Sequence, residues 1–350
     1  MQKLKVASNE AGQRLDKLLS KYLSQAGKGF LYKMMRKKNI TLNGKKCDGS
    51  ERVEEGDEIS LFLADETIEK FSAPLPELAA LGKEKDRNSG KAGKNGENGN
   101  RKKKQEISIV YEDKNVLIVN KPSGMLSQKA KEGDVSLNEH ILNYLIDSGH
   151  LPVSQLRTFR PSICNRLDRN TSGLVVAGTS LAGLQIMNGV LKDRSIHKYY
   201  QCIVKGKIDK PQMIAGFLKK DEAQNTVQIY PLEVEGSVPI MTEYVPVKSS
   251  DTATLLRVTL ITGRSHQIRA HLAYLGKPVL GDIKYGNRKM NERTGTKTQA
   301  LCAVRISFLD IPEENTLHYL SGKVIKLKDP QIVKQFDTLD KNKQVPAEEK

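Results

Sequence analysis

The residues best suited to chemistry in this sequence are one carboxylate and the two arginines that flank it. Asp168 lies between Arg166 and Arg169. Nearby cations favour the ionised form of a carboxylate and lower its pKa, and an ionised, positioned Asp can act as a nucleophile or a general base. The competing interpretation is a structural ion-pair turn of small energetic worth at the surface, and the triplet alone does not exclude it.

The residues that follow Asp168 predict a turn and then a buried strand. Thr171 and Ser172 can hydrogen-bond their own backbone, and Gly173 tolerates a positive φ. The apolar run 174–177 is typical of a strand inside a sheet. We therefore expect Asp168 at the end of a sheet, beside the turn that leads into a strand and between two arginines.

A predicted strand far from Asp168 in sequence carries two adjacent tyrosines, Tyr199 and Tyr200. Adjacent residues of a strand face opposite sides of the sheet, so only one tyrosine can share a face with the carboxylate. The alternation does not choose between them. An ordinary half-buried strand aromatic is the competing interpretation of each.

A second distant segment, 262–271, predicts the end of a strand, a break at Gly263 and a helix with Ser265 as its N-cap. Its two histidines, His266 and His271, are five residues apart and do not share a helical face, so the spacing does not predict a metal pair. The glycine-punctuated stretch 276–286 is a third segment that could meet Asp168, and a scaffold loop is its competing interpretation. The side chains near the helix start that could face a site are Arg264, His266, Gln267 and Arg269.

The composition predicts a basic, globular protein with enough chain for two domains. The 350 residues include 57 Lys and Arg against 41 Asp and Glu, a net charge of +16. Nucleic acid is the first partner to consider, because cationic side chains gain affinity by releasing counterions from phosphates. Four cysteines without paired spacing are expected to be reduced thiols. No apolar run predicts a membrane span or a secretory signal, so we expect a cytoplasmic location.

Residues 1–71 predict a small module of two helices and a hairpin. Apolar residues recur at helical spacing in 13–23 and 30–38, and Asn43-Gly44 predicts a hairpin turn. These features resemble an S4 RNA-binding domain, together with Arg14-Leu15-Asp16 and Glu55-Gly56-Asp57. A solvated helix face is the alternative for any single basic helix. The resemblance implies RNA contacts for Arg14, Lys33, Arg36 and Lys37.

The rest of the chain divides into three predicted parts. Residues 72–105 lack apolar periodicity and predict a flexible basic linker. Residues 106–330 predict helices at 137–147, 180–191 and 265–275, and strands at 107–111, 116–120, 199–204, 227–230, 241–247 and 254–260 besides the one after Gly173. Many strands at irregular spacing with few helices predict a mixed α+β domain with a mainly antiparallel sheet. Residues 331–350 are expected to form a charged C-terminal tail, frayed from Asp337 to Lys350.

The predicted main domain resembles the RluA family of RNA pseudouridine synthases. An S4 module ahead of such a domain is the usual arrangement of family members that act on large-subunit ribosomal RNA. The resembling motifs are Asn120-Lys121-Pro122-Ser123-Gly124, Arg166-Leu167-Asp168 with Thr171-Ser172-Gly173, Lys198 with Tyr200, Arg264 to Arg269 with His271, Gly276 with Pro278, Leu280-Gly281-Asp282 and Tyr285-Gly286.

The resemblance implies roles for particular residues. Asp168 is similar to the family's catalytic aspartate, Tyr200 to its active-site tyrosine, and Arg269 to the basic residue that pairs with the aspartate. Arg166 is similar to an arginine that holds the RNA open when the uridine is extruded. The family usually has His where this chain has Asn165; because Asn still forms hydrogen bonds, we expect activity to survive. Further RNA contacts are expected for Lys121, Arg264, His266 and Gln267.

The implied reaction cleaves the N1 glycosidic bond of a uridine and rejoins the base to the sugar through C5. A stacked base must flip out to be reached. Asp168 would attack C1′ or remove the 2′ proton to give a glycal, and both pathways stay open; Tyr200 would pack the uracil and take the C5 proton. We expect no metal or other cofactor, ribosomal RNA as partner, and no obligate protein partner.

Two other function classes compete with this enzyme. A non-catalytic RNA-binding factor of ribosome assembly would explain the S4-like module and the charge, but not the intact set of Asp168, Tyr200 and Arg269. A glycosidase would need a second carboxylate paired with Asp168, whereas the flanking motif supplies arginines.

Overall fold

The computed structural model describes residues 1–72, 107–131, 133–296 and 298–344. Apart from Ser72, the predicted linker 72–105 lies outside these residues. By its contacts the chain separates into two compact units. The first comprises Met1–Glu106, Asn138–Ser162 and Gly178–Gln185, and the second comprises Ile107–Leu137, Ile163–Ala177 and Ile186–Lys350. Among the described residues, none of the helices has the length and apolar composition needed to cross a bilayer.

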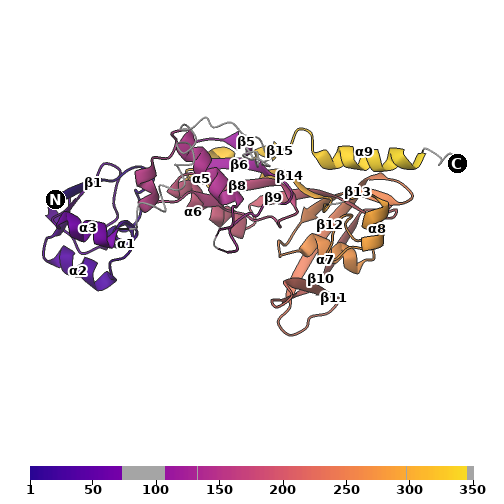
Figure 1. Ribbon diagram of the computed structural model, residues 1–350, viewed down its shortest axis with the longest axis horizontal. Coiled ribbons are helices and arrows are strands. Elements are labelled where there is room, and N and C mark those ends of the chain that lie inside the picture. Colours follow the sequence, from indigo (N-terminus) through magenta and orange to yellow (C-terminus); the bar gives the residue numbers. More distant parts are fainter. Residues whose placement is uncertain (73–106, 132, 297, 345–350) are drawn as a thin grey trace, which may run out of the picture. The chain divides into compact units, whose positions relative to one another are not determined.

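The N-terminal part of the first unit contains the predicted helices and hairpin. The turn residues Asn43 and Gly44 both have positive φ angles, 50° and 73°, as the Asn-Gly signal predicts. Strand β1 and helix α3 were not predicted. The sheet is antiparallel with the order β1-β4-β2-β3. The elements are β1 Gln2–Lys5, α1 Leu15–Tyr22, α2 Lys28–Arg36, β2 Ile40–Leu42, β3 Lys45–Lys46, β4 Glu58–Leu61 and α3 Asp65–Phe71 (Figure 1).

The first unit also takes in two stretches of the predicted domain 106–330. They carry most of α5 (Leu137–Asp147), the 3-10 turn η2 (Val153–Arg157) and the start of α6 (Leu181–Lys192). The hydroxyl of Thr158 donates a hydrogen bond to the carboxylate of Glu10, and Asn9 donates one to Gln155. The contacts that define the unit therefore join segments far apart in sequence, which a linear division of the chain cannot anticipate.

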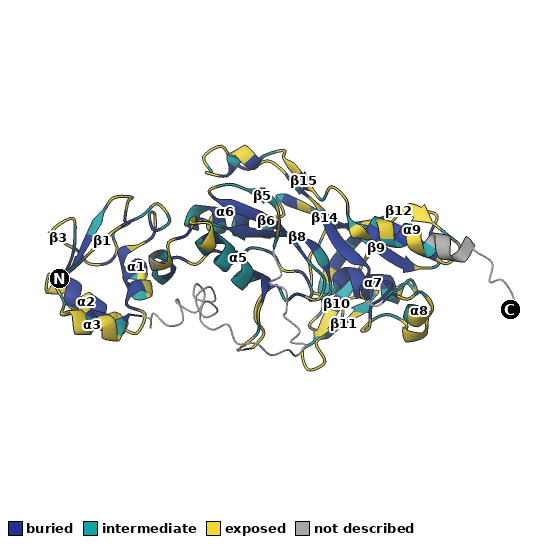
Figure 2. Ribbon diagram, turned by 45° about the horizontal axis from the view of Figure 1, so that its top comes forward, coloured by how far each residue is buried: buried dark blue, intermediate teal, exposed yellow. Residues whose placement is uncertain are grey.

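The second unit is built on an eleven-stranded sheet with the order β11-β10-β12-β13-β9-β14-β8-β6-β5; β15 also pairs with β14, and β7 with β8. Most neighbours are antiparallel, while β8 and β14 are parallel, so the mixed α+β prediction is confirmed. Figure 2 shows the central strands in the buried colour. The strands are β5 Ser108–Glu112, β6 Val116–Lys121, β7 Ser162–Ile163, β8 Ser172–Gly178, β9 Ile196–Lys205, β10 Gln212–Asp221, β11 Thr226–Tyr230, β12 Val238–Ser249, β13 Ala253–Leu260, β14 Leu301–Phe308 and β15 Val324–Lys326.

Four further helical elements belong to the second unit: α7 Gln267–Tyr274, α8 Arg288–Arg293, η3 His318–Leu320 and α9 Gln331–Gln344. Helix α9 occupies much of the segment expected to be a frayed tail. Its Ile332 and Phe336 are buried in one core cluster with Ile203 and Leu255. The helix continues beyond these two anchoring residues to Gln344, so the expectation of fraying from Asp337 on is wrong up to that residue.

A glycine fixes the close approach of β8 and β14. Gly173 has a φ of +112°, and a Cβ there would lie 2.2 Å from the carbonyl oxygen of Ala303. Only glycine satisfies both conditions. Asp168 lies in the loop that leads into β8, so the close pairing of β8 with β14 restricts the position of its carboxylate.

We predict that Gly173→Ala destabilises the protein by at least about 3 kcal/mol, because the new methyl group forces the two strands apart. Urea unfolding followed by circular dichroism measures the change. Gly189→Ala is the matched control, since Gly189 lies inside α6 and nothing comes within 4 Å of a Cβ there; it should be neutral or slightly stabilising. Equal stability of the two variants would contradict the close approach.

Candidate active site

A cavity of about 780 Å³ lies in the second unit, where the loop before β8, strand β9 and the start of α7 converge. Asp168, Tyr200 and Arg269 all line it. The structure therefore brings together the three residues predicted to be catalytic, from segments as much as 101 residues apart. The volume is within the range of small-molecule sites.

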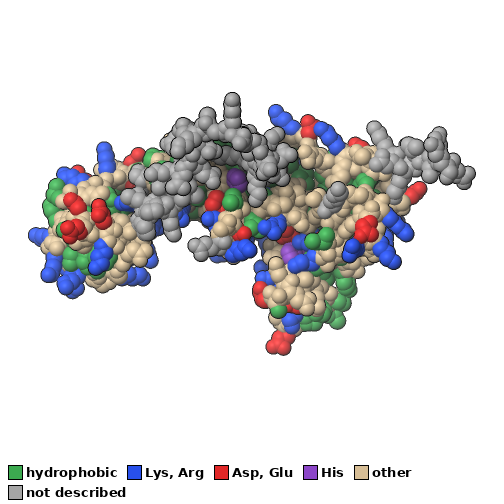
Figure 3. Space-filling model, viewed as in Figure 1, with side chains coloured by type: hydrophobic (Ala, Val, Ile, Leu, Met, Phe, Trp, Pro, Cys, Tyr) green, Lys and Arg blue, Asp and Glu red, His purple; other side chains and the backbone are tan. Residues whose placement is uncertain are grey.

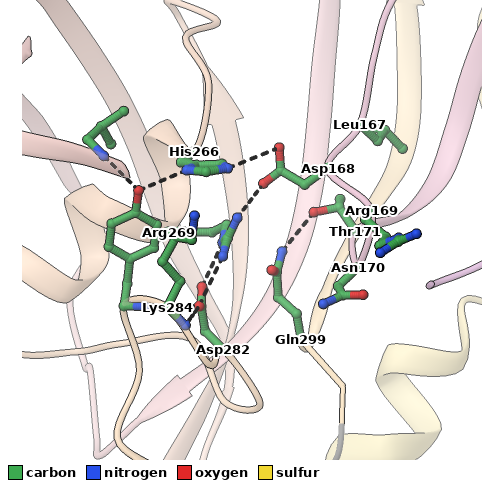
Figure 4. Close-up of polar contacts among 12 residues, drawn as sticks. Leu167, Asp168, Arg169, Asn170, Thr171, His266, Arg269, Asp282, Lys284 and Gln299 are labelled. Carbon is green, nitrogen blue, oxygen red and sulfur yellow. Dashed lines mark hydrogen bonds and ion pairs between the residues drawn. The ribbon is translucent and has the colours of Figure 1, made fainter. Parts of the chain in front are cut away.

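The centre of the site is a guanidinium shared by two carboxylates (Figure 4). Arg269 Nη1 donates to Asp168 Oδ2 over 2.8 Å, while its Nε and Nη2 donate to the two oxygens of Asp282 over 2.7 and 3.1 Å. Burial opposes the charge on Arg269, but the hydrogen bonds and charges of both carboxylates outweigh it and raise its pKa. Arg269 is therefore a fixed cation that holds Asp168 in place.

Asp282 holds that guanidinium and was not identified from the sequence. It is 1% exposed and also accepts the backbone N–H groups of Lys284 and Tyr285, over 2.8 and 3.0 Å. Burial would raise the pKa of its carboxyl, but the hydrogen bonds and charge of Arg269 outweigh burial and keep that pKa low. The stretch 276–286 is thus more than a scaffold loop. The available signal was the place of Asp282 in the motif Leu280-Gly281-Asp282, to which no role was assigned.

His266 lies on the other side of the carboxylate. Its Nε2 is 3.9 Å from Asp168 Oδ1, and its Nδ1 is 2.8 Å from the hydroxyl of Tyr285. Burial lowers the pKa of His266, against the opposing influence of Asp168, so the ring is neutral at pH 7. A neutral ring leaves Asp168 Oδ1 without a second cation in hydrogen-bond range among the described residues.

The start of α7 differs from the prediction. His266, with a left-handed φ of 55°, is the N-cap, and its side chain makes no capping hydrogen bond. Ser265 as N-cap is therefore wrong. The first turn is held instead by Gln267, whose Oε1 accepts the N–H of Arg264 over 3.0 Å and the hydroxyl of Thr262 over 2.9 Å.

Of the two tyrosines on β9, Tyr200 faces the cavity. It is 6% exposed, whereas the ring of Tyr199 is covered by the guanidinium of Arg305 at 4.7 Å. Burial and, secondarily, the charge of Asp168 raise the pKa of Tyr200 far above its ordinary value. Tyr200 is therefore a neutral phenol at physiological pH.

The RNA contact predicted for Lys121 is wrong, because this side chain is fully buried. Its Nζ donates to the carbonyls of Pro122, Met125 and Arg169 over 3.0, 2.8 and 3.0 Å. Burial lowers the pKa of Lys121 to about 8, against the opposing influence of Asp168. This lysine fastens the loop that carries the catalytic carboxylate.

Two other polar residues at the cavity are also committed to the protein. Gln267 is 1% exposed, and its amide nitrogen donates to Thr242 Oγ1 over 2.9 Å, so its predicted RNA contact is wrong too. Asn165 is buried and its Oδ1 accepts the N–H of Val176 over 2.8 Å. The residue that departs from the family pattern thus holds the backbone at the edge of β8.

The remaining predicted RNA contacts are accessible. Arg166, Arg169 and Arg264 are exposed and line the cavity. In the first unit Lys33, Arg36 and Lys37 are exposed along and just beyond α2, and Figure 3 shows Lys and Arg side chains gathered over that region. Arg14 is exposed as well and pairs with Asp16 over 3.1 Å.

Comparison with known proteins gives a consistent result. Residues 115–274 match the family described as RNA pseudouridylate synthase. The ribosomal large subunit pseudouridine synthase C of Salmonella typhimurium (strain LT2) is 27% identical over 334 residues, which cover 93% of this chain and 91% of that protein. Its Vibrio cholerae counterpart is 28% identical over 327 residues and 91% of both chains. The human protein titled RNA Pseudouridylate Synthase Domain Containing 4 superposes with a TM-score of 0.52 at 18% identity, over 67% of this chain and 93% of its own, and so shares the fold.

The chain is an RNA pseudouridine synthase. Within that class, the near full-length match to the bacterial relatives agrees with the resemblance to the RluA family.

We predict that Asp282→Asn lowers turnover by about a hundredfold, because a misdirected guanidinium no longer aims Asp168, and destabilises the protein by about 3 kcal/mol. Single-turnover kinetics and urea unfolding measure the two effects. Asp337→Asn is the control, since it breaks an exposed ion pair with Lys248 and should change stability by less than about 1 kcal/mol. Full activity of Asp282→Asn would exclude the positioning role.

Proposed function

We propose that this enzyme converts specific uridines of large-subunit ribosomal RNA to pseudouridine. The support for this substrate is the similarity to two relatives, each a ribosomal large subunit pseudouridine synthase C that matches nearly the whole chain. The net charge of +16 suits a polyanionic substrate. A cytoplasmic location, where ribosomes are assembled, is part of the proposal.

The single observation that carries the catalytic assignment is the ion pair of Asp168 with Arg269, at 2.8 Å in the cavity wall. A flipped uridine would place its sugar against Asp168, whose carboxylate would attack C1′ or remove the 2′ proton. Both pathways use the same carboxylate. The guanidinium would hold that carboxylate in position throughout either pathway.

Tyr200 is assigned to packing against the uracil. A phenol with a raised pKa keeps its proton at neutral pH and is a weak general base. The buried ring still offers an apolar face to the base. Removal of the C5 proton by Tyr200, the other role considered for it, is therefore the less favourable assignment.

Outside the cavity, RNA contacts are proposed for two groups of residues. Arg166, Arg264 and His266 would hold the flipped nucleotide and its neighbours. Residues 1–71 are proposed to be an S4-like RNA-binding domain joined by the linker 72–105 to the catalytic domain 106–330. Its proposed contacts are Arg14, Lys33, Arg36 and Lys37.

The decisive test replaces the carboxylate without changing its shape. Asp168→Asn should lower the rate of pseudouridine formation by at least about a hundredfold, because the amide has no negative charge to react. Ribosomal RNA from cells that carry only this variant is mapped for pseudouridine and compared with wild type. Retention of every modification, with normal binding of RNA by the variant, would support the alternative of a non-catalytic RNA-binding factor.

The module at residues 1–71 has its own test. Changing Lys33, Arg36 and Lys37 together to Gln should flatten the slope of log affinity against log salt by about 2 to 3 if each contacts one phosphate, and leave the rate at saturating RNA unchanged. The control changes three exposed lysines of the second unit, Lys326, Lys328 and Lys334, to Gln. Equal slopes for the two triple variants would argue against an RNA-binding role of α2.

A further inference from the structure

The cavity contains a lysine that the reaction described above does not use. Lys198 lies on β9 two residues before Tyr200, so the two side chains project from the same face of the sheet, about 7 Å apart along the strand. Both line the cavity, as do the apolar residues Leu191 and Leu260. Lys198 is half-buried, and burial lowers its pKa. Within the described residues its ammonium group makes no ion pair and no hydrogen bond.

A half-buried ammonium without an anion has lost hydration that nothing in the protein restores. Other basic residues of the cavity are either bonded within the protein or exposed to solvent. Arg269 is held by two carboxylates, and Lys284 donates to the carbonyl of Asn225 over 2.7 Å. Arg166, Arg169 and Arg264 are exposed to solvent. An incoming anion would therefore gain more at Lys198 than at a hydrated surface lysine.

The charge of the cavity wall favours such an anion. Asp168 is the one acidic residue among the described residues that line it, and it is already paired with Arg269. Eight basic residues line the same wall: Lys129, Arg166, Arg169, Lys198, Lys220, Arg264, Arg269 and Lys284. Most of the wall therefore attracts negative charge, and the permanent anion of an RNA substrate is the phosphate.

The position of the ammonium separates it from the reacting sugar. Lys198 is not within 4.0 Å of the Asp168 carboxylate, which pairs with Arg269 on one side and faces the neutral ring of His266 on the other. If the sugar of the flipped uridine lies against Asp168, the Lys198 ammonium, on the same cavity wall but apart from the carboxylate, faces the groups bonded to that sugar. The backbone phosphates are among these groups. The ammonium also lies 3.7 Å from where a Cβ of Gly263 would be, so the bare glycine leaves space beside it.

We propose that Lys198 binds one of the two phosphates that flank the flipped uridine. This inference rests on the proposed function, because it needs RNA as the substrate. It assigns to Lys198 a binding role that is separate from the chemistry of Asp168.

The test removes the charge of the ammonium by substitution and, separately, the charge of the phosphate by chemical modification of the RNA. Lys198→Met should weaken binding of an RNA hairpin that contains the mapped target uridine by roughly ten- to a hundredfold. It should flatten the slope of log affinity against log salt by about 0.7 to 0.9, with the rate at saturating RNA changed by less than about threefold. Lys198→Arg should restore most of the affinity, since it restores the charge.

A methylphosphonate placed at the 5′ or the 3′ linkage of the target uridine removes one phosphate charge. At one of these two linkages it should weaken binding by wild type but not by Lys198→Met, because the partner is already gone. Lys205→Met is the matched control: it removes the same charge from the exposed end of the same strand and should respond to both methylphosphonates as wild type does.

Two results would overturn the proposal. One is an additive loss at both linkages, which means that Lys198 contacts neither phosphate. The other is a lower saturated rate for Lys198→Met with unchanged affinity and salt slope, which would place the ammonium against the uracil. Wild-type enzyme in the same assay reports separately on the proposed function: if it forms no pseudouridine in the mapped RNA, the substrate assignment fails before Lys198 is at issue.

Discussion

The site depends on one buried guanidinium held between two carboxylates. Arg269 is 7% exposed, and a buried charge is tolerated only where partners replace its hydration. Asp282 accepts two hydrogen bonds from it and Asp168 accepts one. This asymmetry matters for function. Both oxygens of Asp282 accept hydrogen bonds from the arginine, whereas Asp168 has one oxygen available for the substrate. The turn that carries Asp282 is therefore as important for reactivity as the loop that carries the reacting group.

The helices and the catalytic residues of the second unit could be predicted from the sequence more completely than the strands of its sheet. Leu137–Asp147 was predicted with the bounds that the structure has, and α6 to within a residue or two, because their apolar periodicity is clear. Strands β10 and β14 were missed. The first contains a glycine and ends in charged residues, and the second begins with four consecutive apolar residues before Arg305 and Ser307 interrupt the run. Such strands are defined by their neighbours in the sheet, which a single chain segment does not report.

Within the site, a shared motif did not imply a shared role. Lys121 and Gln267 were expected to touch RNA, yet both are buried and bonded within the protein. Arg264, from the same motif as Gln267, is exposed. The local path of the chain decides which polar residue of a motif points inward. Here that path is determined by the left-handed conformation of His266 and by the loop whose carbonyls bond to Lys121. Residue type and order predicted the location of the chemistry, whereas the contacts separate the residues that support it from those that meet the substrate.

The two oxygens of Asp168 are not equivalent, and this has a consequence for ligand design. Oδ2 accepts a hydrogen bond from Arg269 over 2.8 Å, whereas Oδ1 accepts none from the described residues and lies 3.9 Å from a histidine nitrogen. A sugar mimic with a positive centre at the anomeric position would find this second oxygen unsaturated and could form a charge-assisted hydrogen bond with it. The excess of cations elsewhere on the wall would repel the same molecule. An effective inhibitor therefore needs a zwitterionic design, with its cation confined to the ring and an anionic arm directed away from the carboxylate.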